Sequence, residues 1–149
     1  MSRPLRIQYP GAWYHLMNRG LSRTTIFSDN EDRKLFQKTL EEAVTLWKAR
    51  VHAYSLMDNH YHLLIETPLG NLSRAMRHID GVYTQRFNRR HKQDGPLMRG
   101  RFKSILVDRD SYLLELVRYI HLNGVRALKY RTPKEDPHTS HRAYLNLHS

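Results

Sequence analysis

The hydrophobic residues of this chain follow two different periods, and the two periods alternate along the sequence. Short runs rich in aromatic and branched residues predict strands at 12–17, 51–56, 60–66 and 102–107. Longer runs with an apolar residue every three or four positions predict helices at 28–49, 71–87 and 110–123. This order predicts an α+β, ferredoxin-like fold (split β-α-β), in which a four-stranded antiparallel sheet carries helices on one face, with an extra C-terminal helix that contains a tyrosine.

The length and composition favour one domain over residues 1–149. A chain of 149 residues with 40% hydrophobic residues can bury a core, and no repeat or linker divides it. No apolar run approaches the roughly 20 residues that a membrane span needs, and the first residues have no apolar signal core. The absence of cysteine excludes disulfides and fits a reducing compartment. We therefore expect a soluble, cytoplasmic protein that does not associate with membranes.

The charge predicts a polyanionic partner. Lys and Arg number 25 against 14 Asp and Glu, which gives a formal net charge of +11. The segment 86–103 holds one acid, two interleaved phenylalanines and seven basic residues, namely Arg86, Arg89, Arg90, Lys92, Arg99, Arg101 and Lys103. Basic residues interleaved with aromatic ones are typical of a groove that follows a nucleic-acid backbone, and the alternative is a solvated basic loop. Arg19 is a further candidate for contact with a phosphate.

Two histidines stand on one predicted strand with a single residue between them. Because successive side chains of a strand point to opposite faces, His60 and His62 leave the same face and can share one metal ion. Tyr61 points to the other face. Histidine is common in this chain, with ten copies, so two partly exposed strand histidines are the simpler interpretation of this pair alone.

A phenol and an amide stand four residues apart on the last predicted helix. This spacing stacks Tyr119 and Asn123 on one side of the helix, beside its apolar stripe. Both side chains could therefore meet a metal ion that the strand histidines hold. The alternative is that Asn123-Gly124 only terminates the helix and that Tyr119 is an aromatic residue at the rim of the core. The spacing alone does not decide between the two.

Four segments of the chain carry a resemblance to a known family. They are YHLMNRG at 14–20, YSLMDNHYHLLIETP at 54–68, GPLMRGRFKS at 95–104 and RYIHLNGVRA at 118–127, supported by Ile26-Phe27 and Phe87-Asn88. With these motifs in this order, nearly the whole chain resembles the single-tyrosine HUH transposases, specifically the REP-associated tyrosine transposases and their insertion-sequence relatives.

The resemblance implies a metal-dependent DNA strand transferase. His60 and His62 match the pair that binds a divalent ion, Mg²⁺ or Mn²⁺, and Asn123 matches the third ligand. Tyr119 matches the nucleophile that cleaves DNA through a 5′-phosphotyrosine intermediate and rejoins it. The expected substrate is single-stranded or hairpin DNA, and a homodimer is possible because relatives include both dimers and monomers.

A second tyrosine competes for the role of nucleophile. Tyr83 lies on a predicted helix near basic residues and Asn88. It shares the apolar stripe of that helix with Ile79 and Phe87, which predicts a core position, and Asn88 is five residues away rather than four. We therefore prefer Tyr119.

Two other classes of function remain open from the residues. A ferredoxin-like sheet with aromatic side chains can hold single-stranded nucleic acid without any catalysis. A metal-dependent nuclease could also use water in place of Tyr119, with Glu66 or Asp108 as the base.

Overall fold

In the computed structural model, which describes residues 8–107 and 117–121, four strands form an antiparallel sheet in the order β2-β3-β1-β4. The strands are β1 (Ala12–Arg19), β2 (Arg50–Leu56), β3 (His60–Thr67) and β4 (Lys103–Leu106). The helices are α1 (Asn30–Trp47), α2 (Leu72–Met76) and α3 (Tyr83–His91), with a 3-10 turn η1 (Leu21–Arg23) and a π-helical segment η2 (Arg77–Val82). This topology confirms the ferredoxin-like prediction.

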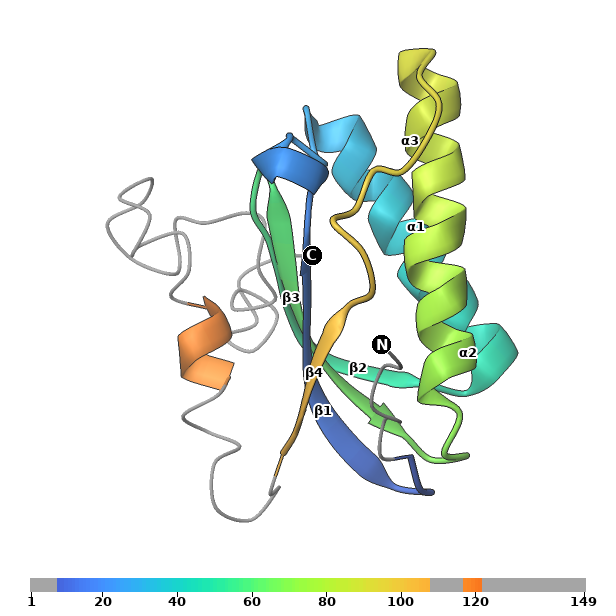
Figure 1. Ribbon diagram of the computed structural model, residues 1–149. Coiled ribbons are helices and arrows are strands. Elements are labelled where there is room, and N and C mark those ends of the chain that lie inside the picture. The colour runs from blue at the N-terminus through green and yellow to red at the C-terminus, as the bar shows by residue number, and fades with distance from the viewer. Residues whose placement is uncertain (1–7, 108–116, 122–149) are drawn as a thin grey trace, which may run out of the picture.

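The helices lie on two sides of the sheet. Figure 1 shows α1, α2 and α3 against one face, whereas the helical turn at 117–121 lies beside the opposite face. This turn belongs to the predicted helix 110–123, and the other residues of that prediction, Asn123 among them, lie outside the described residues, as do Asp108 and the C-terminal tail. Within the described ranges, no helix is long and apolar enough to cross a membrane.

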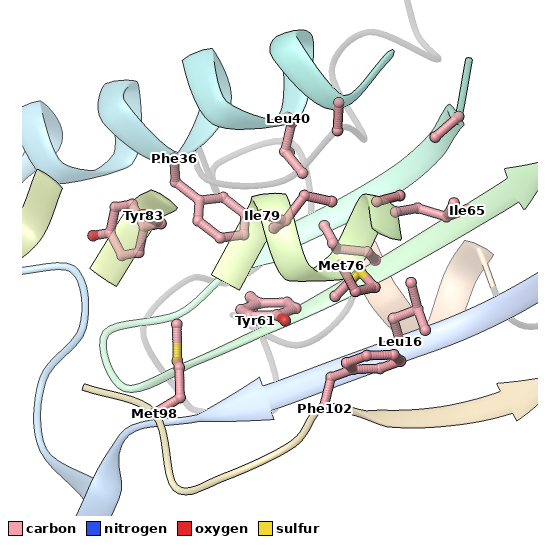
Figure 2. Packing of buried hydrophobic residues seen from close by; sticks show 14 of the residues in the cluster. Leu16, Phe36, Leu40, Tyr61, Ile65, Met76, Ile79, Tyr83, Met98 and Phe102 are labelled. Carbon is pink, nitrogen blue, oxygen red and sulfur yellow. The ribbon is translucent and has the colours of Figure 1, made fainter. Parts of the chain in front are cut away.

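The core fills the space between the sheet and the helices. Figure 2 shows Phe36 of α1, Tyr61 of β3 and Tyr83 of α3 packed together there. The predicted apolar stripe is buried throughout, at Leu72, Ala75, Met76, Ile79, Tyr83 and Phe87. The Tyr83 hydroxyl donates a hydrogen bond to the backbone oxygen of Ile26. Burial raises the pKa of Tyr83 far above its ordinary value, so this tyrosine is a core residue, as its position on the stripe predicts.

The ends of α1 show how side chains set its length. Asp29 caps the first turn by accepting a hydrogen bond from the backbone N–H of Asp32 at 3.1 Å. The helix ends at Trp47, two residues before the predicted end, because Lys48 adopts the left-handed conformation with φ 59°. The Asn71 amide donates to the Trp47 backbone oxygen at 2.7 Å. Asn71 also stands at the N-cap position of α2, but its side chain binds the end of α1 and does not cap α2.

The second predicted helix is interrupted by a wider turn. The residues of η2 have π-helical hydrogen bonding, and α2 and α3 continue the helix on either side. Asp80 in η2 accepts a hydrogen bond from the Tyr61 hydroxyl at 2.6 Å and another from the Asn18 amide at 3.1 Å. The π-helical segment thus carries a carboxylate that joins the helical layer to β1 and β3.

Candidate active site

The sheet face away from α1 presents the histidine pair among basic side chains. The register pairs Arg19 with His60 and Met17 with His62 across β1 and β3. Lys103 of β4 pairs with Met17 on the other side of β1. Residues directly opposite each other on neighbouring strands share a face of the sheet. Arg19 and Lys103 therefore lie on the same face as the two histidines.

The geometry of His60 and His62 suits two ligands of one ion. Their ring centroids are 5.2 Å apart and the rings are almost perpendicular, at 87°. His60 Nδ1 is 2.8 Å from the Asn59 side-chain oxygen. An amide oxygen only accepts hydrogen bonds, so His60 Nδ1 donates and the lone pair of this ring is on Nε2. In this tautomer, Nε2 is the ring nitrogen of His60 that can bind a metal ion.

The spacing of the His60 and His62 rings matches that of two histidines that bind one metal ion. Two imidazoles that bind one ion through Nε2 at about 2.1 Å place their ring centroids about 4.5 to 5.3 Å apart. The observed 5.2 Å falls in this range. In the part of the chain that the structure describes, no three His, Asp or Glu side chains gather as a metal site. The pair therefore fits as two ligands, and Asn123, the predicted third, lies outside that part.

A third histidine, which sequence reasoning missed, joins this pair. His15 on β1 is 6% exposed, and its Nε2 is 2.9 Å from Nδ1 of His62. Burial lowers the pKa of His15 below its ordinary value. Alternation along β1 could have placed His15 on the same face as Trp13 and Met17. Its contact with His62 depends on the register of two strands far apart in sequence.

The helical turn at 117–121 brings Tyr119 to the histidines. The Tyr119 ring centroid is 5.9 Å from that of His62 and 5.9 Å from that of His15, in edge-to-face arrangements. Ile120 is fully buried and packs with Ala53 and Leu64 of the sheet. Tyr119 itself is 44% exposed. Its phenol thus lies beside the histidine pair and is open to a large ligand.

Two of the predicted DNA-binding arginines form ion pairs within the protein. Arg86 of α3 donates to Glu42 of α1 at 2.7 Å. Arg90 donates to Asp29 and Asp32 at 2.8 Å each. These contacts lower the pKa of Asp29 and of Glu42 to about 2. Arg86 and Arg90 therefore fasten α3 to α1, in the layer on the other side of the sheet from the histidines.

The other predicted DNA-binding residues divide between two places. Arg89 and Lys92 are exposed at the end of α3, while Arg99, Arg101 and Lys103 are exposed in or near β4. The Arg99 backbone N–H donates to the Arg19 backbone oxygen at 2.8 Å, so these two arginines lie close to each other at the His60 end of the sheet. The Nε of Arg19 is buried and has no hydrogen-bond partner among the described residues.

Glu66 occupies the opposite end of β3. Its carboxylate is 3.0 Å from His52 Nε2 and 3.7 Å from the Arg50 guanidinium. Four residues along a strand separate Glu66 from His62, which corresponds to about 13 Å. The structure does not bring Glu66 to the histidine pair.

The fold and the profile of the sequence define the family. The four-stranded ferredoxin-like sheet places the chain in the α+β class, with two histidines on one strand and a tyrosine beside them. The sequence profile of the family described as "Transposase IS200 like" matches residues 8–123. The chain belongs to this family of IS200-like transposases.

Two solved structures share this fold. A REP-associated tyrosine transposase bound to a REP hairpin aligns with 100% of this chain and 89% of its own, at 17% identity and a TM-score of 0.78. A putative transposase from Deinococcus radiodurans aligns with 80% of this chain and 94% of its own, at 17% identity and a TM-score of 0.55. No curated protein sequence matches the chain.

Proposed function

We propose that this transposase cleaves and rejoins single-stranded DNA by transesterification with Tyr119 as the nucleophile. The observation that carries the proposal is the position of the Tyr119 ring, 5.9 Å from that of His62, in a residue that is 44% exposed to solvent. His62 in turn lies 5.2 Å from His60 in a geometry that suits a shared ion. The proposed nucleophile and the two proposed metal ligands lie on one face of the sheet, which supports the proposal.

The reaction exchanges one ester bond for another. The Tyr119 oxygen bonds to phosphorus, and the bond from phosphorus to the 3′ oxygen breaks. The phenol loses its proton and the 3′ oxygen gains one, which leaves a 5′-phosphotyrosine and a free 3′ hydroxyl. Because the ester energy is kept in the covalent adduct, the reverse attack by a 3′ hydroxyl rejoins DNA without a nucleotide cofactor. This agrees with the absence of a GxxxxGK[ST] phosphate loop in the sequence.

His60 and His62 would hold a divalent ion, with Asn123 as the third ligand. Only about one phenol in a thousand is ionised in water at pH 7, so the site has to favour the phenolate and the charge that develops on the phosphate. A bound Mg²⁺ or Mn²⁺ supplies Lewis-acid polarisation of the phosphate. Two nitrogen ligands suit Mn²⁺ better than Mg²⁺, which prefers oxygen.

The substrate that fits best is unpaired or hairpin DNA. Arg19, Arg99 and Lys103 lie on or beside the sheet face that carries the histidines. We assign these residues and Arg101 to the DNA backbone near the cleaved bond, and Arg89 and Lys92 to more distant contacts. The structural relative solved with a REP hairpin supports a hairpin as the form of DNA that this fold binds.

A protein–DNA adduct tests the proposal. Labelled single-stranded DNA and Mn²⁺ are incubated with the protein, and a denaturing gel separates free DNA from DNA linked to protein. We expect a linked band with the natural protein and at least a hundredfold less with Tyr119→Phe, which lacks only the attacking oxygen. Tyr9→Phe is the matched control, because Tyr9 is similarly exposed at 46%.

The other outcomes identify other functions. A linked band that disappears in Tyr83→Phe but not in Tyr119→Phe would assign the reaction to the buried tyrosine. Cleaved ends without any adduct would indicate hydrolysis by water, and unchanged DNA that is nevertheless bound would indicate a binding module. Each of these results contradicts the proposal.

A further inference from the structure

We propose that His15 is a positioning residue of the active site, which fixes the ring of His62 in the tautomer that presents Nε2 to a metal ion. The inference rests on the metal-binding role that is proposed for His62 above. His15 is not part of the His60/His62 pair and would touch neither metal nor DNA. Its role would be exerted through the hydrogen bond to His62.

The hydrogen bond between the two rings permits only two arrangements when both are neutral. His15 Nε2 and His62 Nδ1 are 2.9 Å apart, and one of them must donate. If His62 Nδ1 donates, the lone pair of His62 is on Nε2. If His15 Nε2 donates, the proton of His62 is on Nε2 and that atom cannot bind a metal. A competent site therefore requires His15 to accept.

The same arrangement is fixed at the neighbouring histidine. His60 Nδ1 donates to the Asn59 side-chain oxygen at 2.8 Å, so its lone pair is on Nε2. His60 and His62 thus each have Nδ1 engaged by a protein side chain. Metal-binding histidines commonly have their second nitrogen held in this way, which sets the tautomer and the orientation of the ring.

His15 is well placed to hold a ring still. It lies on β1, a central strand that pairs with β3 on one side and β4 on the other. His15 and His62 are buried, at 6% and 7% exposed, so water competes little for their hydrogen bond. Their rings are nearly parallel, at 24°, with centroids 5.2 Å apart. The sheet therefore fixes the donor and the acceptor relative to each other.

His15 also contacts the proposed nucleophile. Its ring meets that of Tyr119 edge to face, with centroids 5.9 Å apart and an angle of 72°. One buried imidazole therefore touches a proposed ligand and the tyrosine that attacks. Without His15, the rings of His62 and Tyr119 would each lose a contact that holds their orientation.

The tautomer of His62 can be measured without any metal. Nitrogen-15 labelled histidine in the metal-free protein gives separate NMR shifts for protonated and unprotonated ring nitrogens. We expect His62 to carry its proton on Nδ1 in the natural protein and in His15→Gln, whose side-chain oxygen can accept. In His15→Leu, which fills space without accepting, we expect the Nε2-protonated form to become the major one. His78→Ala is the matched control, because His78 pairs with Glu42 in the other layer.

Metal affinity provides the second readout. Titration with Mn²⁺ alone, followed by electron paramagnetic resonance, should show binding weakened ten- to a hundredfold in His15→Leu and largely restored in His15→Gln. In His60→Ala, which lacks a ligand, binding should be lost.

Two results would overturn the inference. One is a proton on Nε2 of His62 in the metal-free natural protein, which decides the question even if His15→Leu does not fold. The other is an unchanged His62 tautomer in a folded His15→Leu protein. If the natural protein has the expected tautomer but binds no Mn²⁺, the proposed function fails and the positioning of His62 by His15 stands.

Discussion

Among the residues that the structure describes, Asp80 carries a carboxylate whose charge its surroundings oppose. Tyr61, which lies between the two histidines in sequence, donates its hydroxyl to one oxygen of Asp80, and Asn18 donates to the other. Removal from water opposes these hydrogen bonds and is the larger effect, so the pKa of Asp80 rises to about 6 from an ordinary 3.8. The folded protein therefore holds a proton on Asp80 at a pH where the unfolded chain has released it.

This difference predicts that the charge of Asp80 reduces stability as the pH rises. Between pH 4 and pH 6 the folded state binds more protons at this group, so the free energy of unfolding falls, by about 3 kcal/mol at most. Asp80→Asn removes the titration. We therefore expect the free energy of unfolding of Asp80→Asn, relative to that of the natural protein, to be higher at pH 7 than at pH 4. Urea unfolding of both proteins at both pH values measures this difference. A constant difference between the two proteins would contradict the assignment.

Among the elements, the turn after β1 depends on a glycine. Gly20 has ordinary extended dihedral angles, but a Cβ at this position would lie 2.1 Å from the backbone oxygen of Thr24. The backbone N–H of Gly20 donates to Asn59 in the β2–β3 turn at 2.9 Å, and its neighbour Leu21 donates to Leu97 at 2.9 Å. The turn therefore holds three segments together at the end of the sheet that carries His60.

A matched pair of glycine substitutions tests this close approach. Gly20→Ala forces the backbone at Thr24 to move, and we expect a loss of about 1–3 kcal/mol in the free energy of unfolding. Gly81 lies in η2, is exposed and has open space around it, so Gly81→Ala should stabilise the protein by up to about 1 kcal/mol. Thermal unfolding of both variants measures the difference. Equal effects would show that the contact at Gly20 relaxes without cost.

The elements also show how far a sequence predicts this structure. Short runs rich in aromatic and branched residues located all four strands, including β4, which has no buried residue, and the apolar stripe of 72–87 located the second helix. The sequence did not predict the π-helical segment, because a single wide turn leaves the apolar stripe of the helix intact. The sequence also did not predict the contacts of Arg90 with Asp29 and of His15 with His62, because each pair joins residues that only the folded chain brings together. The spacing of His60 and His62 was readable because it is local.

For the whole molecule, the positive charge serves two purposes. On the helical side, Arg86 and Arg90 neutralise carboxylates of α1 or of its cap. On the other side of the sheet, Arg99 and Lys103 are exposed near the histidines and make no ion pair with another described residue. The count of 25 Lys and Arg therefore overstates the number of basic side chains that are available to contact a polyanion, although these ion pairs leave the net charge of +11 unchanged.

The two sets of arginines should respond differently to substitution. Arg99→Gln should weaken the binding of single-stranded DNA and reduce the dependence of log K on log salt by about 0.7, the value for one phosphate contact. Arg86→Gln should leave this slope unchanged and lower stability by up to about 1 kcal/mol, because it breaks the pair with Glu42. Fluorescence anisotropy at several salt concentrations and thermal unfolding separate the two effects. A reduced slope in Arg86→Gln would place that arginine at the DNA.

The segment His60-Tyr61-His62 contributes side chains to both faces of the sheet. The Tyr61 phenol lies in the core, and the two imidazoles lie on the face with Tyr119. A shift of β3 by one residue would exchange them, turning two imidazoles toward the core between sheet and helices and the phenol toward the face with Tyr119. The gain or loss of one residue in the β2–β3 hairpin would therefore disrupt the core and the histidine face in one step.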